Sequence, residues 1–343
     1  NLRVEENLGE GYVRLRVSEA ERRQAKHDIQ HVEDIVIEML RNARDAGADK
    51  VYLATTKEDG VRTLVFLDNG SGVPQDMQER IFDARVTSKL ESMKMDRWGV
   101  HGRGMALFSI KQNTDEARVV ASDVDLGSVF KVSVATDRLG ERADQSSWPQ
   151  AVKDEDGHYV CARGPHNIIR AACEFALEEL RACDVYLGSP SEIAATLHAQ
   201  ASSRLDASRL LFIDDEAELP VVDRLGLASD AEDFIRICSG LGLEMSERTA
   251  HRILAGQIKP VRGVTARLLR ERDSSSHASA PVDLAKDRRG LRIAKDDMAQ
   301  FSRAVERDFN DLAARYYLNL CGDPKIRVSR DRITVTFDLA KEE

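Results

Sequence analysis

The chain has 343 residues, enough for two or three domains with hydrophobic cores, and its 42% of hydrophobic and 32% of charged residues argue against wholesale disorder. Its net charge of -9 excludes a protein covered by positive potential but leaves room for a local basic patch. Five widely spaced cysteines without a CxxC pair favour reduced thiols over disulfides or a zinc site. Without a signal peptide or a run of about 18 apolar residues, we expect a cytoplasmic protein with no membrane contact.

The first part of the chain alternates strand and helix patterns. Residues 11–17 alternate apolar and polar side chains, as a short strand does. Apolar residues then recur at helical spacing from Ile29 to Ala46, and Gly47 is placed to end that helix. The remaining expected elements are strands at 51–55 and 61–67, short helices at 77–82 and 105–111, and a hairpin of 119–122 with 128–134.

The rest of the chain is mostly helical in pattern, interrupted by two polar stretches. Helical spacing recurs in the segments 167–183, 192–200, 230–238, 246–254 and 264–272. We therefore expect a domain over 1–140, a linker over 141–160, a mainly helical domain over 161–272, a loop over 273–290, and a C-terminal helix and β-hairpin over 291–343.

The helix expected at 29–46 carries a polar stripe on an otherwise apolar surface. Glu38 and Asn42 are four residues apart and Asp45 follows three later, so the three lie on one face. An amide oxygen can bind Mg²⁺ without adding charge, and a neighbouring carboxylate can orient or deprotonate water. A solvated face of an amphipathic helix is the alternative explanation.

Two glycine motifs follow on the same part of the chain. Asp68-x-Gly70-x-Gly72 stands at the end of an apolar strand, where a carboxylate can accept a hydrogen bond from the exocyclic amine of adenine; a simple turn is the alternative. Gly99-x-x-Gly102-x-Gly104 precedes an apolar helix, whose first backbone amides can bind phosphate. It fits neither the Rossmann motif nor the P-loop.

Together, the three motifs resemble the N box, G1 box and G2 box of the GHKL superfamily of ATP-binding proteins, in the same order and at similar separations. The resemblance covers about residues 20–136, and Gly127-Ser128 stands where the family has Gly-Thr on the last strand. It implies an α+β protein with a Bergerat-type α/β sandwich, in which helices cover one face of a mixed, largely antiparallel sheet. ATP and Mg²⁺ are the implied ligands, and the family implies lid closure and homodimer formation on ATP binding.

The resemblance also implies a role for each matching residue. Asn42 corresponds to the Mg²⁺ ligand, and Asp68 corresponds to the carboxylate that reads adenine, with Ser128 nearby. Gly70 and Gly72 correspond to hinges of the lid. The other implied nucleotide contacts are Asp45, Lys89, Gly99, Gly102, Arg103 and Gly104. A surface lysine without such a contact is the alternative for Lys89.

Glu38 bears on whether the chain is a hydrolase or a kinase. In the hydrolysing branch of the family, a Glu four residues before the Asn is the base for the attacking water, so the resemblance favours an ATPase with Glu38 as catalytic residue. Residues 80–83 and 87–89 instead resemble a histidine-kinase lid. His27 and His31 precede the N box without a phosphoacceptor motif, and a histidine-kinase-like enzyme or an ATP-gated signalling switch stays the alternative.

Residues 230–261 resemble a helix-turn-helix segment, whose second helix begins at Ser246 and ends at Gly256. From 246 to 272 there are two acidic and seven basic residues, a net +5 in a chain of -9, and the basic ones are Arg248, Arg252, Lys259, Arg262, Arg267, Arg270 and Arg272. Such a local reversal of charge suits contact with the phosphates of DNA, above all through Arg248, Arg252, Lys259 and Arg262. A helical hairpin packed on the ATP-binding domain, with solvated arginines, is the alternative.

Overall fold

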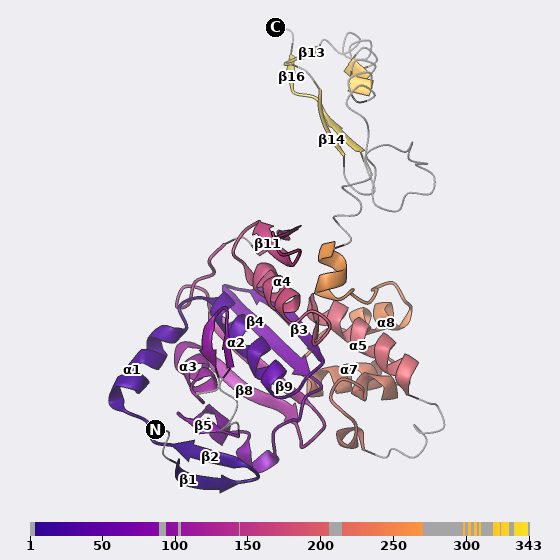
Figure 1. Ribbon diagram of the computed structural model, residues 1–343. Coiled ribbons are helices and arrows are strands. Elements are labelled where there is room, and N and C mark those ends of the chain that lie inside the picture. Colours follow the sequence, from indigo (N-terminus) through magenta and orange to yellow (C-terminus); the bar gives the residue numbers. More distant parts are fainter. Residues whose placement is uncertain are drawn as a thin grey trace. The chain divides into compact units, whose positions relative to one another are not determined.

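The computed structural model describes residues 4–88, 94–101, 104–143, 145–205 and 215–269, together with short stretches between 298 and 341. The chain divides into two compact units, residues 1–275 and 276–343. The first unit contains all the motifs of the predicted ATP site (Figure 1).

A five-stranded sheet forms the centre of the first unit, in the order β12-β3-β4-β9-β8. Its strands are β3 (Lys50–Glu58), β4 (Val61–Asp68), β8 (Glu116–Ser122), β9 (Ser128–Ala135) and β12 (Asp184–Gly188). Only β12 is parallel to its neighbour β3, and the other pairs are antiparallel. Asp59 and Gly60 both have positive φ between β3 and β4, as a tight two-residue hairpin requires.

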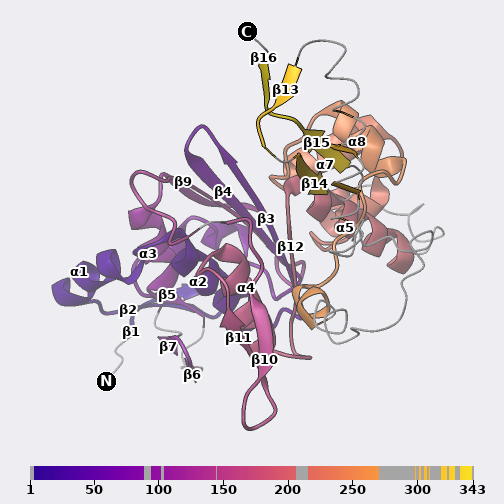
Figure 2. The same ribbon diagram turned by 90° about the horizontal axis from the view of Figure 1, so that it is seen from above.

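Helices α2 (Val32–Asp45), α3 (Ala106–Asn113) and α4 (Ile168–Glu178) lie on one side of this sheet, as Figure 2 shows. Ile35 and Leu40 of α2 are fully buried in one hydrophobic cluster with Leu64 and Phe66 of β4. Burial of such a side chain stabilises the fold by about 1.5–3 kcal/mol. Gly47, with φ +76°, follows the end of α2 as expected.

Helices α5 (Pro190–Arg204), α7 (Ala231–Gly240) and α8 (Glu247–Leu254) cover the opposite side of the same sheet (Figure 2). Here Val65 and Leu67, which alternate with Leu64 and Phe66 along β4, are buried in a second cluster with Phe234 of α7. The expectation of helices on one face therefore holds only for the first part of the chain. Helices from the second half complete three layers, because both faces of β4 are apolar.

The segments expected to be a linker and a helical domain contain further strands. β10 (Gln150–Lys153) and β11 (Tyr159–Arg163) pair as a hairpin in and after the range 141–160. Residues 161–269 do not form a separate helical body, because β12 joins the central sheet and α4 packs on α2. The boundaries expected at 140 and 160 thus fall inside the first compact unit.

A small sheet and several short elements surround the predicted ATP site. β1 (Val4–Gly9), β2 (Tyr12–Leu15) and β5 (Val86–Thr87) form three antiparallel strands, and Ser18 and Glu21 form a capping box at the start of α1 (Glu19–Asp28). The remaining elements of this unit are the 3-10 turns Gln75–Met77, Arg80–Phe82, Glu216–Glu218 and Arg224–Leu227, the hairpin β6 (Lys94–Asp96) with β7 (Gly99–His101), and a helical stretch at 264–269.

The second unit contains two antiparallel strand pairs. β13 (Leu318–Leu320) pairs with β16 (Leu339–Lys341), and β14 (Lys325–Val328) pairs with β15 (Ile333–Thr336) where a hairpin is predicted. The loop expected at 273–290 and most of the helix expected at 295–318 lie outside the described residues. In the part of the chain that the structure describes, no helix is long and apolar enough to span a membrane.

Candidate functional site

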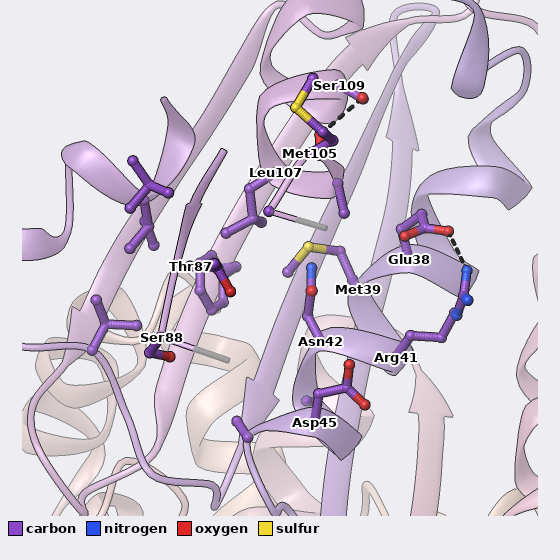
Figure 3. Close-up of a pocket in the computed structure, with 18 of the residues that line it drawn as sticks. Glu38, Met39, Arg41, Asn42, Asp45, Thr87, Ser88, Met105, Leu107 and Ser109 are labelled. Atoms are coloured by element: carbon purple, nitrogen blue, oxygen red, sulfur yellow. Dashed lines mark hydrogen bonds and ion pairs between the residues drawn. The ribbon is translucent and has the colours of Figure 1, made fainter. Parts of the chain in front are cut away.

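A cavity of about 570 Å³ lies beside α2 and brings together residues from all three motifs. Glu38, Asn42 and Asp45 line it from α2, and Asp68 and Ser128 line it from the ends of β4 and β9. Gly104, the first residues of α3, Thr87 and Ser88 also line it. Figure 3 shows Asn42 and Met39 pointing into this space from α2, and Arg41 on another flank of the helix, where it meets Glu38.

The side-chain amide of Asn42 on α2 has an unsatisfied nitrogen. Its Nδ2 atom is buried and makes no hydrogen bond with any residue that the structure describes. A buried amide without a partner costs about 1–3 kcal/mol, and sites that bind ligands commonly contain such groups. Because amide nitrogen and oxygen can exchange places by a flip, the Asn42 side chain can offer either atom to a ligand in the cavity.

Glu38 is held by an arginine one turn further along α2. Its Oε1 atom accepts a hydrogen bond from Arg41 at 2.7 Å (Figure 3). Arg41 in turn donates from Nε to Asp96 of β6 at 3.0 Å, and its side chain is only 3% exposed. The predicted base therefore lies in a buried ion-pair chain that extends from α2 to the β6–β7 hairpin.

The same chain of ion pairs includes a second arginine of α2. Arg44 donates to Asp45, Asp96 and Glu179, each within 3.1 Å. Burial disfavours its charged form, but these three hydrogen bonds outweigh that effect and raise the pKa of Arg44. Asp45, expected to contact the nucleotide, is thus also an anchor for Arg44.

Asp68 and Ser128 are direct cross-strand partners at the ends of β4 and β9. Both side chains are buried, and Asp68 Oδ1 accepts a hydrogen bond from the backbone N–H of Gly70 at 2.8 Å. Ser122 Oγ lies 3.2 Å from Ser128 Oγ and donates to the carbonyl of Gly127 at 2.8 Å. A carboxylate and a hydroxyl thus stand side by side at one end of the cavity, where they can bind an amine-bearing ring.

The glycines of the second motif permit close packing of the backbone. A Cβ at Gly70 would lie 2.8 Å from the carbonyl oxygen of Ala46, and a Cβ at Gly72 would lie 1.7 Å from that of Asp123. Gly72 also has φ +71°, which L-residues rarely adopt. Neither glycine is among the cavity's lining residues. Their geometry supports a role in bringing the turn against α2 and β8, and the hinge role stays a prediction.

The structure describes only some of the residues that are predicted to bind the phosphates of ATP. Gly104, with φ +67°, Met105 and Ala106 line the cavity just before and at the start of α3, whose N-terminus favours anions. Gly99 is in β7. Lys89, Gly102 and Arg103 lie outside the described residues.

Arg85 lines the cavity although no sequence motif points to it. It has φ +63°, unusual for a side chain of this size, and its backbone N–H donates to the carbonyl of Gly104 at 2.8 Å. Its guanidinium pairs with Glu21 of α1, while its Nε atom is buried without a partner. Hydrogen bonds from Ser18 and the nearby Arg85 keep the pKa of Glu21 below its usual range. Only the tertiary structure identifies this cation.

The charge of the cavity wall bears on the ligand it can accept. Among the described lining residues, five carboxylates (Glu21, Asp28, Glu38, Asp45 and Asp68) outnumber two guanidiniums (Arg41 and Arg85). No group of three or more His, Cys, Asp or Glu side chains suited to a metal ion occurs in the described ranges. A magnesium ion would therefore need phosphate oxygens as ligands beside Asn42, which fits its usual arrival with a nucleotide.

The four residues predicted to contact nucleic acid lie on another part of the first unit. Arg248, Arg252, Lys259 and Arg262 are all exposed. The predicted helix-turn-helix segment contains α7 and α8, and these two helices pack against each other. Arg267 is also exposed but stacks on Trp148, with its guanidinium 3.8 Å from the ring centre.

Comparisons with known proteins find one matching family and several similar proteins. Residues 29–122 match the family model described as histidine kinase-, DNA gyrase B-, and HSP90-like ATPase. The DNA mismatch repair proteins MutL of Staphylococcus aureus strains Newman and JH1 are 28% identical over 136 residues, which are 37% of this chain but only 20% of MutL. The crystal structure of full-length ShkA in complex with AMPPNP aligns with 66% of this chain and 48% of that chain, at 17% identity and a TM-score of 0.24, too low for a structural argument.

Proposed function

We propose that the chain binds ATP with Mg²⁺ in the cavity beside α2 and hydrolyses it, because residues 29–122 match the family model of histidine kinase-, DNA gyrase B-, and HSP90-like ATPases. The observation that carries the proposal is the convergence of Asn42, Asp68 and Ser128 on one cavity, with the buried amide of Asn42 unpaired. The two cross-strand residues suit the adenine end, and the start of α3 suits the phosphates.

In this proposal each residue has a separate task. Asp68 accepts a hydrogen bond from the adenine amine, and Asn42 supplies an oxygen to the magnesium ion. The ion offsets phosphate charge, which the acidic wall of the cavity otherwise repels. Arg85, whose backbone N–H donates to the carbonyl of Gly104, contributes positive charge to the cavity wall.

Glu38 is the proposed base for the attacking water. Its pairing with Arg41 orients the carboxylate on the cavity side of α2. Water activation then requires that a carboxylate oxygen turn toward the γ-phosphate. Arg41 and Asp96 are positioning residues in this scheme, because they act through Glu38.

The test is ATP turnover by wild type and Glu38→Ala, with ATP affinity measured in parallel. We expect turnover to fall at least 100-fold in the variant, which is the scale of lost general-base catalysis, while ATP still binds. Glu179→Ala is the matched control, because Glu179 pairs with Arg44 of the same ion-pair chain but does not line the cavity. An equal loss in both variants, or unchanged turnover in Glu38→Ala, would remove Glu38 from the mechanism.

A kinase or an ATP-gated signalling switch is the second candidate. The similarity of residues 80–83 and 87–89 to a histidine-kinase lid favours it. Neither His27 nor His31 is among the residues that line the cavity. Acid-labile, base-stable radiolabel on the protein after incubation with γ-labelled ATP would support the kinase and displace the hydrolase.

We also propose that ATP binding promotes a homodimer and that the ATP cycle acts on nucleic acid. The dimer rests on the family resemblance, and sedimentation of the chain with and without a non-hydrolysable ATP analogue tests it. The nucleic-acid part rests on the local basic residues of 246–269 and on the similarity to a protein of DNA mismatch repair.

A further inference from the structure

Helices α7 and α8 form a compact helix-turn-helix on the far side of the central sheet. Asp230 and Ser246 cap the two helices through their side chains. The turn between them bends at Gly242, with φ +68°, and is closed by the Leu243 N–H, which donates to the carbonyl of Cys238 at 2.8 Å. Phe234 of α7 is fully buried against the sheet.

The second helix is held by few contacts and leaves most of its surface to solvent. Only Ala250 and Ile253 of α8 are buried. Arg248 and Arg252 are four residues apart, so they lie together on the side of α8 away from the sheet. His251 is exposed beside them, and these residues line an open hollow together with Gln257.

After α8 the chain returns along the same surface. The N–H groups of Gln257 and Ile258 donate to the carbonyl of Arg252, and the N–H of Val261 donates to Thr196 of α5 at 2.9 Å. This anchors the loop with the exposed Lys259 and Arg262.

We call four exposed basic residues the basic surface: Arg248, Arg252, Lys259 and Arg262. Their side chains form no hydrogen bond or ion pair within the described part of the chain. The sequence between residues 246 and 269 contains a single acidic residue, Glu247. Four uncompensated positive charges in a chain of net charge -9 make this surface complementary to a polyanion.

We propose that the basic surface binds duplex DNA, with α8 in the major groove. This inference rests on the proposed action on nucleic acid and names its partner and surface. In a helix-turn-helix, side chains of the second helix reach base edges, and here these are Arg248 in the first turn of α8 and Arg252 one turn further along. Lys259 and Arg262 follow α8 on its anchored loop, and they bind phosphates beside the groove.

The two phosphate contacts set the salt dependence of binding. Each neutralised phosphate lowers the slope of log K against log salt by about 0.9, so Lys259 and Arg262 give a slope of roughly -1.8. Removal of Arg248 and Arg252 together should weaken binding and leave this slope nearly unchanged.

The experiment is fluorescence anisotropy of a labelled 20-base-pair duplex of mixed sequence, titrated with the whole chain in the absence of nucleotide between 50 and 200 mM salt. Wild type should bind with the slope given above, and Arg248→Ala/Arg252→Ala should lose at least tenfold in affinity. Arg22→Ala/Arg23→Ala on α1 is the control with the same charge change on another exposed helix surface, and it should bind like wild type. Unchanged melting temperatures exclude unfolding as a cause.

Three results would overturn the inference: no binding by wild type, an equal loss in the α1 control, or tighter binding of a single strand of the same length. The last result would indicate a stacking or backbone site in place of a major-groove helix. Glu38→Ala should bind the duplex like wild type, so failure of the ATPase proposal and failure of this one give different results.

Discussion

Gly72→Ala tests whether the glycines after Asp68 are needed for close packing. An alanine Cβ at this position would lie 1.7 Å from the carbonyl oxygen of Asp123, whereas carbon–oxygen contacts of this kind are normally about 3.3–3.6 Å. The turn or β8 must therefore move by more than about 1.5 Å. The left-handed φ of +71° adds a cost of roughly 1–2 kcal/mol for any L-residue.

Gly60→Ala is the matched control, because it isolates the cost of the backbone conformation. Gly60 has φ +80° in the turn between β3 and β4, and a Cβ there would meet no atom within 4 Å. Both variants reduce the entropy of the unfolded chain equally, so that effect cancels in the comparison. We expect Gly72→Ala to lower the free energy of unfolding by about 1–3 kcal/mol more than Gly60→Ala, the usual cost of overpacking.

Urea unfolding followed by circular dichroism measures both variants, and equal m values would show that the midpoints can be compared. Binding of a fluorescent ATP analogue should also weaken in Gly72→Ala, because Ser71 lines the cavity next to the displaced turn. If the two variants unfold at the same free energy within about 0.5 kcal/mol, the turn yields to the methyl group, and a hinge role for Gly72 gains support.

Two further predictions concern buried charges and thiols. Asp96→Asn should lower the free energy of unfolding by about 3 kcal/mol, the lower end for removal of one partner of a buried ion pair, because Arg41 and Arg44 keep other carboxylates. Calorimetry checks this with the exposed Asp137→Asn as control, and an equal loss of stability in the two variants would contradict it. Burial raises the pKa of the Cys183 and Cys238 thiols from 9.0 to about 12. Above pH 9 the unfolded chain therefore releases protons that the folded chain keeps, and the free energy of unfolding should fall as pH rises from about 9 to 11. In urea titrations, Cys238→Ala should make this decline shallower by up to about 1.4 kcal/mol per pH unit, and an unchanged slope would refute the assignment.

The parts of the site that the sequence predicts are those carried by short motifs. Glu38, Asn42 and Asp45 share a helix face because α2 has the expected period, and Asp68 stands at a strand end as expected. The pairing of Asp68 with Ser128 is not local, because the antiparallel neighbours β4 and β9 are far apart in the sequence. All five of these residues line the cavity.

The residues that the sequence does not predict depend on contacts between distant segments. Arg41 and Asp96 are 55 residues apart, and Arg44 and Glu179 are 135 apart, so no local pattern reveals the ion-pair chain. Arg85 has no motif, and its backbone conformation follows from hydrogen bonds to Leu15 and Gly104. β12 pairs in parallel with β3 across more than 120 residues, a connection that periodicity cannot show.

One sequence signal did point to the third layer. The run Leu64–Leu67 in β4 is apolar at every position, whereas a strand with one face in solvent alternates apolar and polar side chains. In the structure, Leu64 and Phe66 face the cluster that contains α2, and Val65 and Leu67 face the cluster that contains α7. A continuous apolar run in an antiparallel strand is thus a reason to look for a second covering layer elsewhere in the chain.

This layer makes the ATP site depend on the second half of the chain. Leu67 and Val129, each adjacent in sequence to a site residue, are fully buried on the α7 side of the sheet. Without residues beyond 140, these side chains and Tyr52 would face water, and β3 would lose its pairing with β12. Exposure of one such side chain costs about 1.5–3 kcal/mol, so three of them approach the whole stability of a typical domain. The helices that cover this face of the sheet, including α8 of the basic surface, therefore also stabilise the strand ends that hold Asp68 and Ser128.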